Sequence, residues 1–79
     1  MKHDLKIWPM NLFPILVGKK TCEIRVNDRN YQVGDILCLR AFDPDKQEYI
    51  NDMIFEREVT YINLIPNSKL VALSIKEVA

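Results

Sequence analysis

The spacing of hydrophobic residues changes at Gly18. Between residues 10 and 17, apolar side chains recur at the three- and four-residue intervals of a helix. Asn11 offers an N-cap side chain, Pro14 fits a first helical turn, and Gly18 suits the left-handed position after a helix. The pattern predicts a short helix over residues 10–17. Its expected buried stripe is Leu12, Phe13, Leu16 and Val17.

Most of the remaining chain shows the two-residue alternation of β-strands. The predicted strands are residues 3–8, 20–26, 36–42, 53–65 and 69–78, with a further start at 49–50. Turn-forming residues separate them at 27–30, 34–35, 43–46 and 66–68. Short strands at regular spacing favour a barrel, which removes exposed sheet edges. We expect an α+β, β-rich fold: a small mixed β-barrel of five to six strands, with one short helix between the first two strands.

The alternation also predicts which side chains point to the core. In the second strand, Glu23 and Arg25 fall on the face opposite to the apolar residues. In the fourth strand, one set of apolar side chains shares a face with Arg57, whereas Ile54 and Ile62 fall on the other face. The apolar residues expected on these faces are Cys22, Ile24 and Val26, then Phe55, Val59 and Tyr61, and in the last strand Val71, Leu73 and Ile75.

Length and charge limit the number of domains and the classes of function that the sequence allows. The 79 residues fit a single domain, residues 1–79, and the 28% charged composition is ordinary for a globular protein. A formal net charge of zero argues against a strong, indiscriminate nucleic-acid binder. Residues 19–40 nevertheless hold five basic side chains against three acidic ones, and residues 43–58 hold six acidic against two basic. One region is therefore mildly basic and the next is acidic, a pattern that in most proteins reflects a mixed solvated surface.

Cysteine usage and hydropathy indicate a cytoplasmic protein. The first residues are polar, and no run approaches the roughly 20 apolar residues of a membrane span. We expect Cys22 and Cys38 to be reduced, and we expect no membrane partner. These cysteines and His3 lack the spacing of a zinc site, so no metal or cofactor is expected. A nucleophilic Cys22 would need His3, which we expect on a mobile terminus.

The run GKKTCEIR, residues 18–25, carries the most informative motif. It resembles the G-x-K-x-x-E-x-R motif of the ASCH domain family, a branch of the PUA-like fold, at the same helix–strand junction. The following NDR at 27–29, VGD at 33–35 and VTYI at 59–62 are similar to a small bacterial and phage ASCH subfamily of unknown function. The resemblance covers nearly the whole chain. It implies a PUA-like barrel with a ligand cleft between helix and barrel.

The motif residues suit recognition of a phosphate, a carboxylate or a nucleobase edge. Glu23 and Arg25 are two residues apart on a strand, so they project from one face and can pair. Lys20 adds a point charge from the bend after the helix. The full set of expected ligand-binding residues is Lys20, Thr21, Glu23, Arg25, Asn27, Arg29 and Arg40. The competing interpretation is an ordinary surface ion pair, worth roughly 0–1 kcal/mol.

Other candidates have simpler structural interpretations. Asp35 is expected to hydrogen-bond its own turn, and Asn27 and Asp28 to do similar work at the rim of the cleft. Trp8 and Tyr31 can stack on bases, although such aromatic residues more often belong to a core.

Three functions remain open from the sequence. The first is a binding module for RNA or a nucleotide-like ligand. The second is an enzyme using Lys20 and Glu23, because some ASCH proteins resemble N4-acetylcytidine amidohydrolases and some relatives are ribonucleases. Those amidohydrolases carry threonine where this chain has Glu23, and a neighbouring carboxylate favours the charged ammonium over the nucleophilic amine. The third is a regulatory protein-interaction module. We favour the binding module.

Overall fold

The computed structural model describes residues 1–78, and within them the chain forms five strands and one helix. The elements are β1 (Lys2–Ile7), α1 (Pro9–Leu16), β2 (Cys22–Val26), β3 (Ile36–Asp43), β4 (Glu48–Leu64) and β5 (Leu70–Glu77). The expected β-rich α+β fold, with one short helix between the first two strands, is confirmed. No helix in this part of the chain is both long and apolar enough to cross a membrane.

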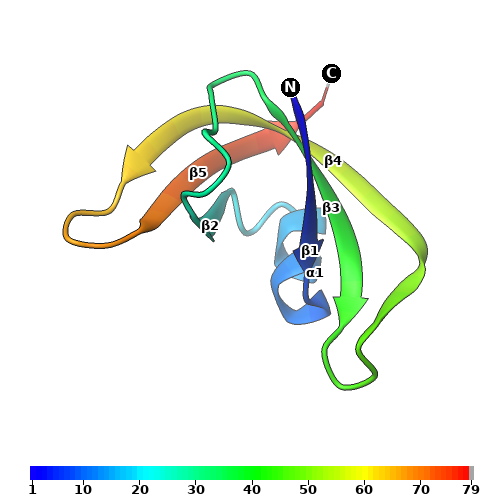
Figure 1. The fold of residues 1–79 in the computed structure, drawn as a ribbon. Coiled ribbons are helices and arrows are strands. Elements are labelled where there is room, and N and C mark those ends of the chain that lie inside the picture. Colours follow the sequence, from blue (N-terminus) through cyan, green and yellow to red (C-terminus); the bar gives the residue numbers. More distant parts are fainter. Residues whose placement is uncertain (79) are drawn as a thin grey trace.

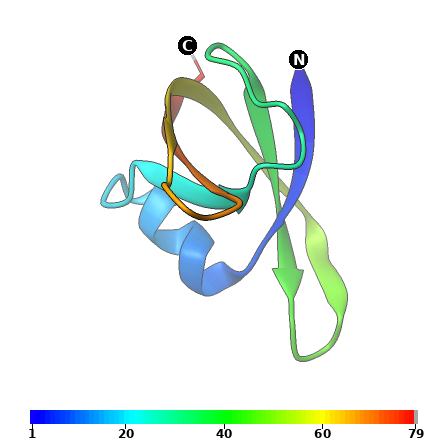
Figure 2. The same ribbon diagram turned by 60° about the vertical axis from the view of Figure 1, so that its left-hand side comes forward.

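The strands form one mixed sheet that curls into a half-barrel (Figures 1 and 2). Their order is β1-β3-β4-β5-β2, with β1 and β3 parallel and the other pairs antiparallel. Strand β3 lies inside the sheet, between β1 and β4. The barrel is not closed by backbone pairing, however, because β1 and β2 form the two ends of the sheet.

Helix α1 begins one residue earlier than expected, with Pro9 in its first position after Trp8. Asn11 therefore lies within the helix and is not its N-cap. The helix also ends one residue earlier than expected, at Leu16, with Val17 as its C-cap. Gly18 has the predicted left-handed conformation, with a φ of +79°. The buried stripe also differs from the expected one: Leu12, Ile15 and Leu16 lie three and four residues apart and so share the face that packs on the core. Leu12 and Ile15 are buried and Leu16 half-buried, whereas Phe13 and Val17 are exposed.

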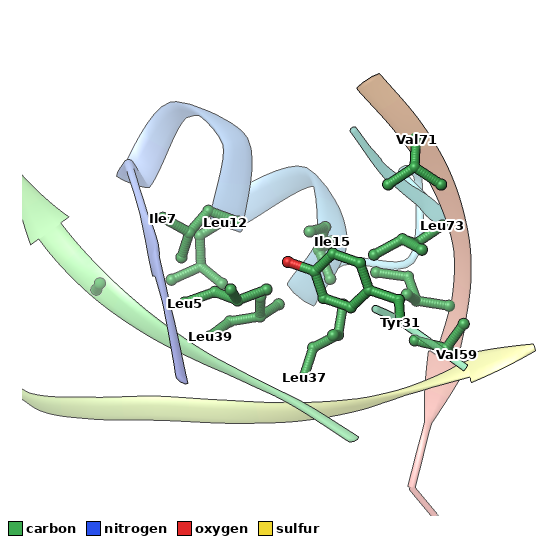
Figure 3. Close-up of a cluster of buried hydrophobic side chains, with 12 residues drawn as sticks. Leu5, Ile7, Leu12, Ile15, Tyr31, Leu37, Leu39, Val59, Val71 and Leu73 are labelled. Atoms are coloured by element: carbon green, nitrogen blue, oxygen red, sulfur yellow. The ribbon is translucent and has the colours of Figure 1, made fainter. Parts of the chain in front are cut away.

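The hydrophobic core lies inside the curled sheet and under the helix (Figure 3). It is built from side chains of β1, α1, β3, β4 and β5 together with Tyr31 from the loop before β3. Val71, Leu73 and Ile75 face inward as expected. The cluster is Leu5, Ile7, Leu12, Ile15, Tyr31, Leu37, Leu39, Ala41, Val59, Val71, Leu73 and Ile75.

Strand β2 has the opposite orientation to the one its alternation predicts. Glu23 is 5% exposed, whereas Ile24 and Val26 are 56% and 52% exposed. The reason is register: Glu23 pairs with Leu73 and Arg25 with Val71, and both partners face the core. Residues directly opposite in a sheet share a face, so the polar pair is turned inward.

A register shift changes the faces of β4 between Val59 and Tyr61. Val59 is fully buried, but Tyr61 is 63% exposed, so the expected common face of the two residues is wrong. An extra residue in one strand moves every later side chain to the other face. Ile62 consequently packs against the core in place of Tyr61.

Candidate functional site

A buried carboxylate joins two basic side chains on the inner face of β2. Glu23 Oε1 accepts a hydrogen bond from Lys20 Nζ at 3.3 Å, and Glu23 Oε2 accepts one from Arg25 Nε at 2.9 Å. The expected pairing of Glu23 with Arg25 is confirmed. The burial of Glu23 sets this arrangement apart from an ordinary surface ion pair, because an unpaired charge at such a position would be strongly unfavourable. We call Lys20, Glu23 and Arg25 the carboxylate-centred triad.

The junction between α1 and β2 positions Lys20. Lys19 and Lys20 both donate their backbone N–H to the Pro14 carbonyl at 2.9 Å, which holds the chain as it leaves the helix. Thr21 then accepts a backbone hydrogen bond from Ile75 at 2.9 Å, which fixes the start of β2 against β5. Thr21 is itself exposed and, with Lys20, lines a small hollow of about 150 Å³ next to Arg57 and Lys76.

Arginine side chains join the two ends of the sheet. Arg25 Nη2 donates to the Lys6 carbonyl at 2.5 Å, and Arg29 Nη1 donates to the Asp4 carbonyl at 3.1 Å. Both acceptors belong to β1, whereas Arg25 lies on β2 and Arg29 in the loop that follows it. Arg25 therefore contacts Glu23 and β1 at the same time. These guanidinium contacts, which we call the arginine seam, occupy the gap left between β1 and β2.

Two hollows lie on either side of the triad. The first, of about 460 Å³, lies between the helix and β2 and is lined by Asn11, Lys20, Cys22, Glu23 and Ile24. The second, of about 360 Å³, adjoins the arginine seam and is lined by Leu5, Ile24, Arg25, Val26, Asp28, Arg29, Tyr31 and Leu70. Because Ile24 lines both, the hollows are neighbours on either side of this residue. Together they form the candidate ligand cleft.

A buried polar cluster lies next to Tyr31, one of the residues that line the second hollow. His3 Nε2 lies 2.8 Å from Asp35 Oδ2, and Gln32 donates its backbone N–H to the same oxygen at 3.0 Å. The contact with Gln32 confirms that Asp35 hydrogen-bonds its own turn. The expectation of a mobile His3 is wrong: His3 is buried and packs edge-on against Tyr31 at 4.8 Å between ring centroids. His3 falls in the same two-residue alternation as the core residues Leu5 and Ile7, and this pattern could have predicted its burial.

Two ionisable groups of this region have shifted pKa values. The hydrogen bond from His3 is the main cause that lowers the pKa of Asp35 to about 2, against the opposing effect of burial. Burial raises the pKa of Tyr31, although Arg25 and Arg29 oppose the shift. Asp35 is thus ionised and Tyr31 protonated at neutral pH. The Tyr31 phenol can therefore donate a hydrogen bond, while its ring packs with the core (Figure 3).

The remaining expected site residues lie at different distances from the triad. Arg29 joins Arg25 at the second hollow, and Asn27 lies beyond it, where its backbone N–H donates to the Lys69 carbonyl at 2.8 Å. Arg40 does not approach the cleft, because β3 pairs with β1 and β4 and not with β2. It stacks on Tyr49, with 4.2 Å from its guanidinium carbon to the ring centroid.

Arg40 belongs to a separate cluster on the outer face of the sheet. Lys6 lies over the Phe42 ring at 4.4 Å from its centroid, and the rings of Phe42 and Tyr49 are 5.2 Å apart. We call Lys6, Arg40, Phe42 and Tyr49 the outer-face cluster. It accounts for the position of Arg40 without a ligand.

The cysteines and metal-ligating residues do not assemble into a further site. Both Cys22 and Cys38 are free, with Cys22 half-buried and Cys38 buried. Burial is the main cause that raises the pKa of the Cys38 thiol, which keeps it protonated. Within residues 1–78, no group of three or more His, Cys, Asp or Glu side chains could hold a metal ion.

Comparison with known proteins gives a family without an assigned activity. The family model described as a domain of unknown function, DUF3850, matches residues 2–75 and therefore nearly the whole chain. No curated protein matches the sequence.

Proposed function

The chain belongs to the DUF3850 family, and we propose that it binds RNA or a nucleotide-like ligand in the cleft beside β2. The observation that carries the proposal is the carboxylate-centred triad, in which a buried Glu23 orients two cations that line two neighbouring hollows. The resemblance of residues 18–25 to the ASCH motif supports the same proposal. The proposal also includes the classification of the half-barrel as PUA-like and a cytoplasmic location for the protein.

The triad offers the hydrogen-bonding groups that a phosphate or a base edge requires. Glu23 uses one N–H of Lys20, so this ammonium keeps two donors for a ligand. Arg25 uses its Nε–H and one N–H of Nη2 in the fold, so both N–H groups of Nη1 and the second of Nη2 remain as donors. The triad carries one net positive charge, from two cations and one carboxylate. This charge suits one anionic group and not a long stretch of phosphate backbone.

The walls of the cleft suit the apolar faces of a nucleobase. Ile24 is exposed on β2 and lines both hollows, while Leu5 and Tyr31 line the second. Ligand sites combine such apolar walls with a few placed polar groups. Since the whole chain carries no net charge, we expect modest affinity that depends on local contacts.

The experiment compares two adjacent lysines with a labelled single-stranded oligouridylate of about ten nucleotides, within the usual site size for small folds. Lys20→Ala removes a triad donor and should weaken binding by about 1–3 kcal/mol, or roughly 5- to 150-fold in Kd. Lys19→Ala is the matched control, because Lys19 is exposed and lines neither hollow of the cleft. Fluorescence anisotropy measures both. Equal losses, or no binding by the wild type, would contradict the proposal.

Hydrolysis is the competing function, because an amine beside a carboxylate in a hollow is a common catalytic arrangement. Against it, both Glu23 oxygens already accept hydrogen bonds from cations. We expect no conversion of N4-acetylcytidine by mass spectrometry and no cleavage of the oligouridylate. Conversion or cleavage that is lost in both Lys20→Ala and Glu23→Gln would put the enzyme first.

The third function is a regulatory protein-interaction module without a nucleic-acid ligand. It would be favoured if the protein bound neither RNA nor nucleoside.

A further inference from the structure

The two hollows of the cleft continue into a third. This third hollow, of about 500 Å³, lies between the end of β2 and the β4–β5 turn, and Val26, Asp28 and Leu70 line both it and the second hollow. Its remaining lining residues are Asn27, Leu64, Ile65, Ser68 and Lys69. The three hollows therefore follow one another along β2. Together they form a groove from α1 to the β4–β5 turn, two elements that lie at opposite ends of β2 in Figure 1.

Basic side chains recur along this groove. Lys20 lines the first hollow, Arg25 and Arg29 the second, and Lys69 the third. The acidic residues among them are paired: Glu23 with Lys20 and Arg25, and Asp28 with Arg29 at 3.8 Å. The groove is therefore net positive, although the whole chain is neutral. Such a line of cations fits a partner with regularly spaced negative charges.

Exposed apolar side chains alternate with these cations. Ile24 and Val26 on β2, and Leu70 on β5, are 56%, 52% and 39% exposed and line the groove. Surfaces that bind single strands combine cations for the phosphates with side chains, usually aromatic, on which successive bases stack. In this groove, aliphatic side chains offer the apolar contact. An extended peptide fits less well, because strand addition needs a free backbone edge and the arginine seam occupies the β1 side of β2.

We propose that the groove takes a single-stranded RNA segment of several nucleotides, extending from the triad to Lys69 at the β4–β5 turn. This inference rests on the proposed function and specifies its ligand. The five residues of β2 span roughly 17 Å at about 3.4 Å per residue. That length suits a segment of a few nucleotides, because an extended single strand spaces its phosphates more widely than the about 3.4 Å rise of a strand in a double helix. The β4–β5 turn is tied to β2 by the hydrogen bond from Asn27 N–H to the Lys69 carbonyl, so its place in the groove is fixed.

The test is a length series of oligouridylates from one to about eight nucleotides, with affinity measured by competition. Binding should strengthen with each nucleotide over the first few and then level off, as for a short site. Lys69→Ala should weaken binding of the five-nucleotide RNA about 3- to 10-fold, lower its salt slope by about one, and leave uridine monophosphate unaffected. Lys20→Ala should weaken binding at every length.

The control is Lys46→Ala, which removes an exposed lysine from the β3–β4 turn, outside the groove. Far-ultraviolet circular dichroism of each variant checks that it is folded. Affinity that does not change with length, or equal effects of Lys69→Ala and Lys46→Ala, would overturn the extended site. Lys20-dependent binding of the mononucleotide would then still support the proposed function. If an acidic peptide outcompeted every RNA, both proposals would fail.

Discussion

Glu23 is a charged residue in a position where the curled sheet would ordinarily bury an apolar one. It pairs across the sheet with the fully buried Leu73, and it is itself 5% exposed. Removing a carboxylate from water is costly, and the contacts with Lys20 and Arg25 offset that cost. The same contacts hold the two cations at the cleft, so one residue connects the stability of β2 with the chemistry proposed for the site.

Replacing Glu23 should therefore destabilise the protein. Glu23→Ala leaves the two cations without their shared acceptor and opens a void, and we expect a loss of about 2–4 kcal/mol in the free energy of unfolding. Glu23→Gln keeps an acceptor and should lose about half as much. Urea denaturation measures both. Glu48→Ala, at an exposed strand position, is the control and should change stability by less than about 0.5 kcal/mol. Equal losses in all three variants would contradict the account.

At the residue scale, the sequence was enough to predict which side chains pair but not whether the pair is buried. The two-residue spacing of Glu23 and Arg25 was enough to predict their pairing, which the 2.9 Å contact confirms. Their burial could not be predicted, because local alternation places the apolar Ile24 and Val26 inward. The orientation depends on the register with β5, a contact between residues about 50 positions apart that no local pattern encodes.

At the scale of elements, the junction of β1 and β2 determines how complete the barrel is. The backbone does not join these strands, and the arginine seam supplies the contacts instead. Turn residues and strand periodicity were sufficient to predict the number of elements and the helix between the first two strands. The incomplete closure was not predictable, because it depends on side chains of β2 and its loop contacting carbonyl groups of β1.

Loss of the seam should loosen β1. Arg29→Ala removes the hydrogen bond to the Asp4 carbonyl, which is worth about 1 kcal/mol, so amides of residues 2–7 should exchange about 3- to 10-fold faster with deuterium. Arg25→Ala should have a larger effect, since it also removes the contact with Glu23. Mass spectrometry of peptides from β1 and β4 gives the measurement. Lys46→Ala is the control. Unchanged exchange in β1 with faster exchange in β4 would show that the seam does not hold β1.

At the scale of the whole molecule, the buried cluster of His3, Asp35 and Tyr31 connects β1 with the loop before β3. Figures 1 and 2 show that this loop crosses from the β2 end of the sheet toward the β1 end. Asp35 accepts contacts from His3 and from the Gln32 backbone, and the pKa of its carboxyl is lowered to about 2. The cluster therefore links the ends of the half-barrel in a manner that depends on the ionisation of Asp35.

This link should give the protein an acid-sensitive stability. Because the pKa of Asp35 in the folded state, about 2, lies below its ordinary value of 3.8, its contribution is complete above pH 4 and is lost as the pH falls toward 2. Asp35→Asn should reduce the free energy of unfolding by about 2 kcal/mol at pH 7, with the difference shrinking toward pH 2. Thermal unfolding across pH 2–7 measures it, with the exposed Asp52→Asn as control. A difference that stayed constant with pH would contradict this role.

The central claim is that the cleft beside β2 binds single-stranded RNA or a nucleotide-like ligand through the triad. Its most direct test is a titration of the ¹⁵N-labelled protein with a five-nucleotide oligouridylate, followed by two-dimensional NMR. We predict progressive shifts of the Asn11, Lys20 and Arg25 amides and of the Arg25 side-chain Nε–H, with Tyr49 unchanged. Shifts confined to the outer-face cluster, or no shifts at RNA concentrations in the millimolar range, would contradict the claim.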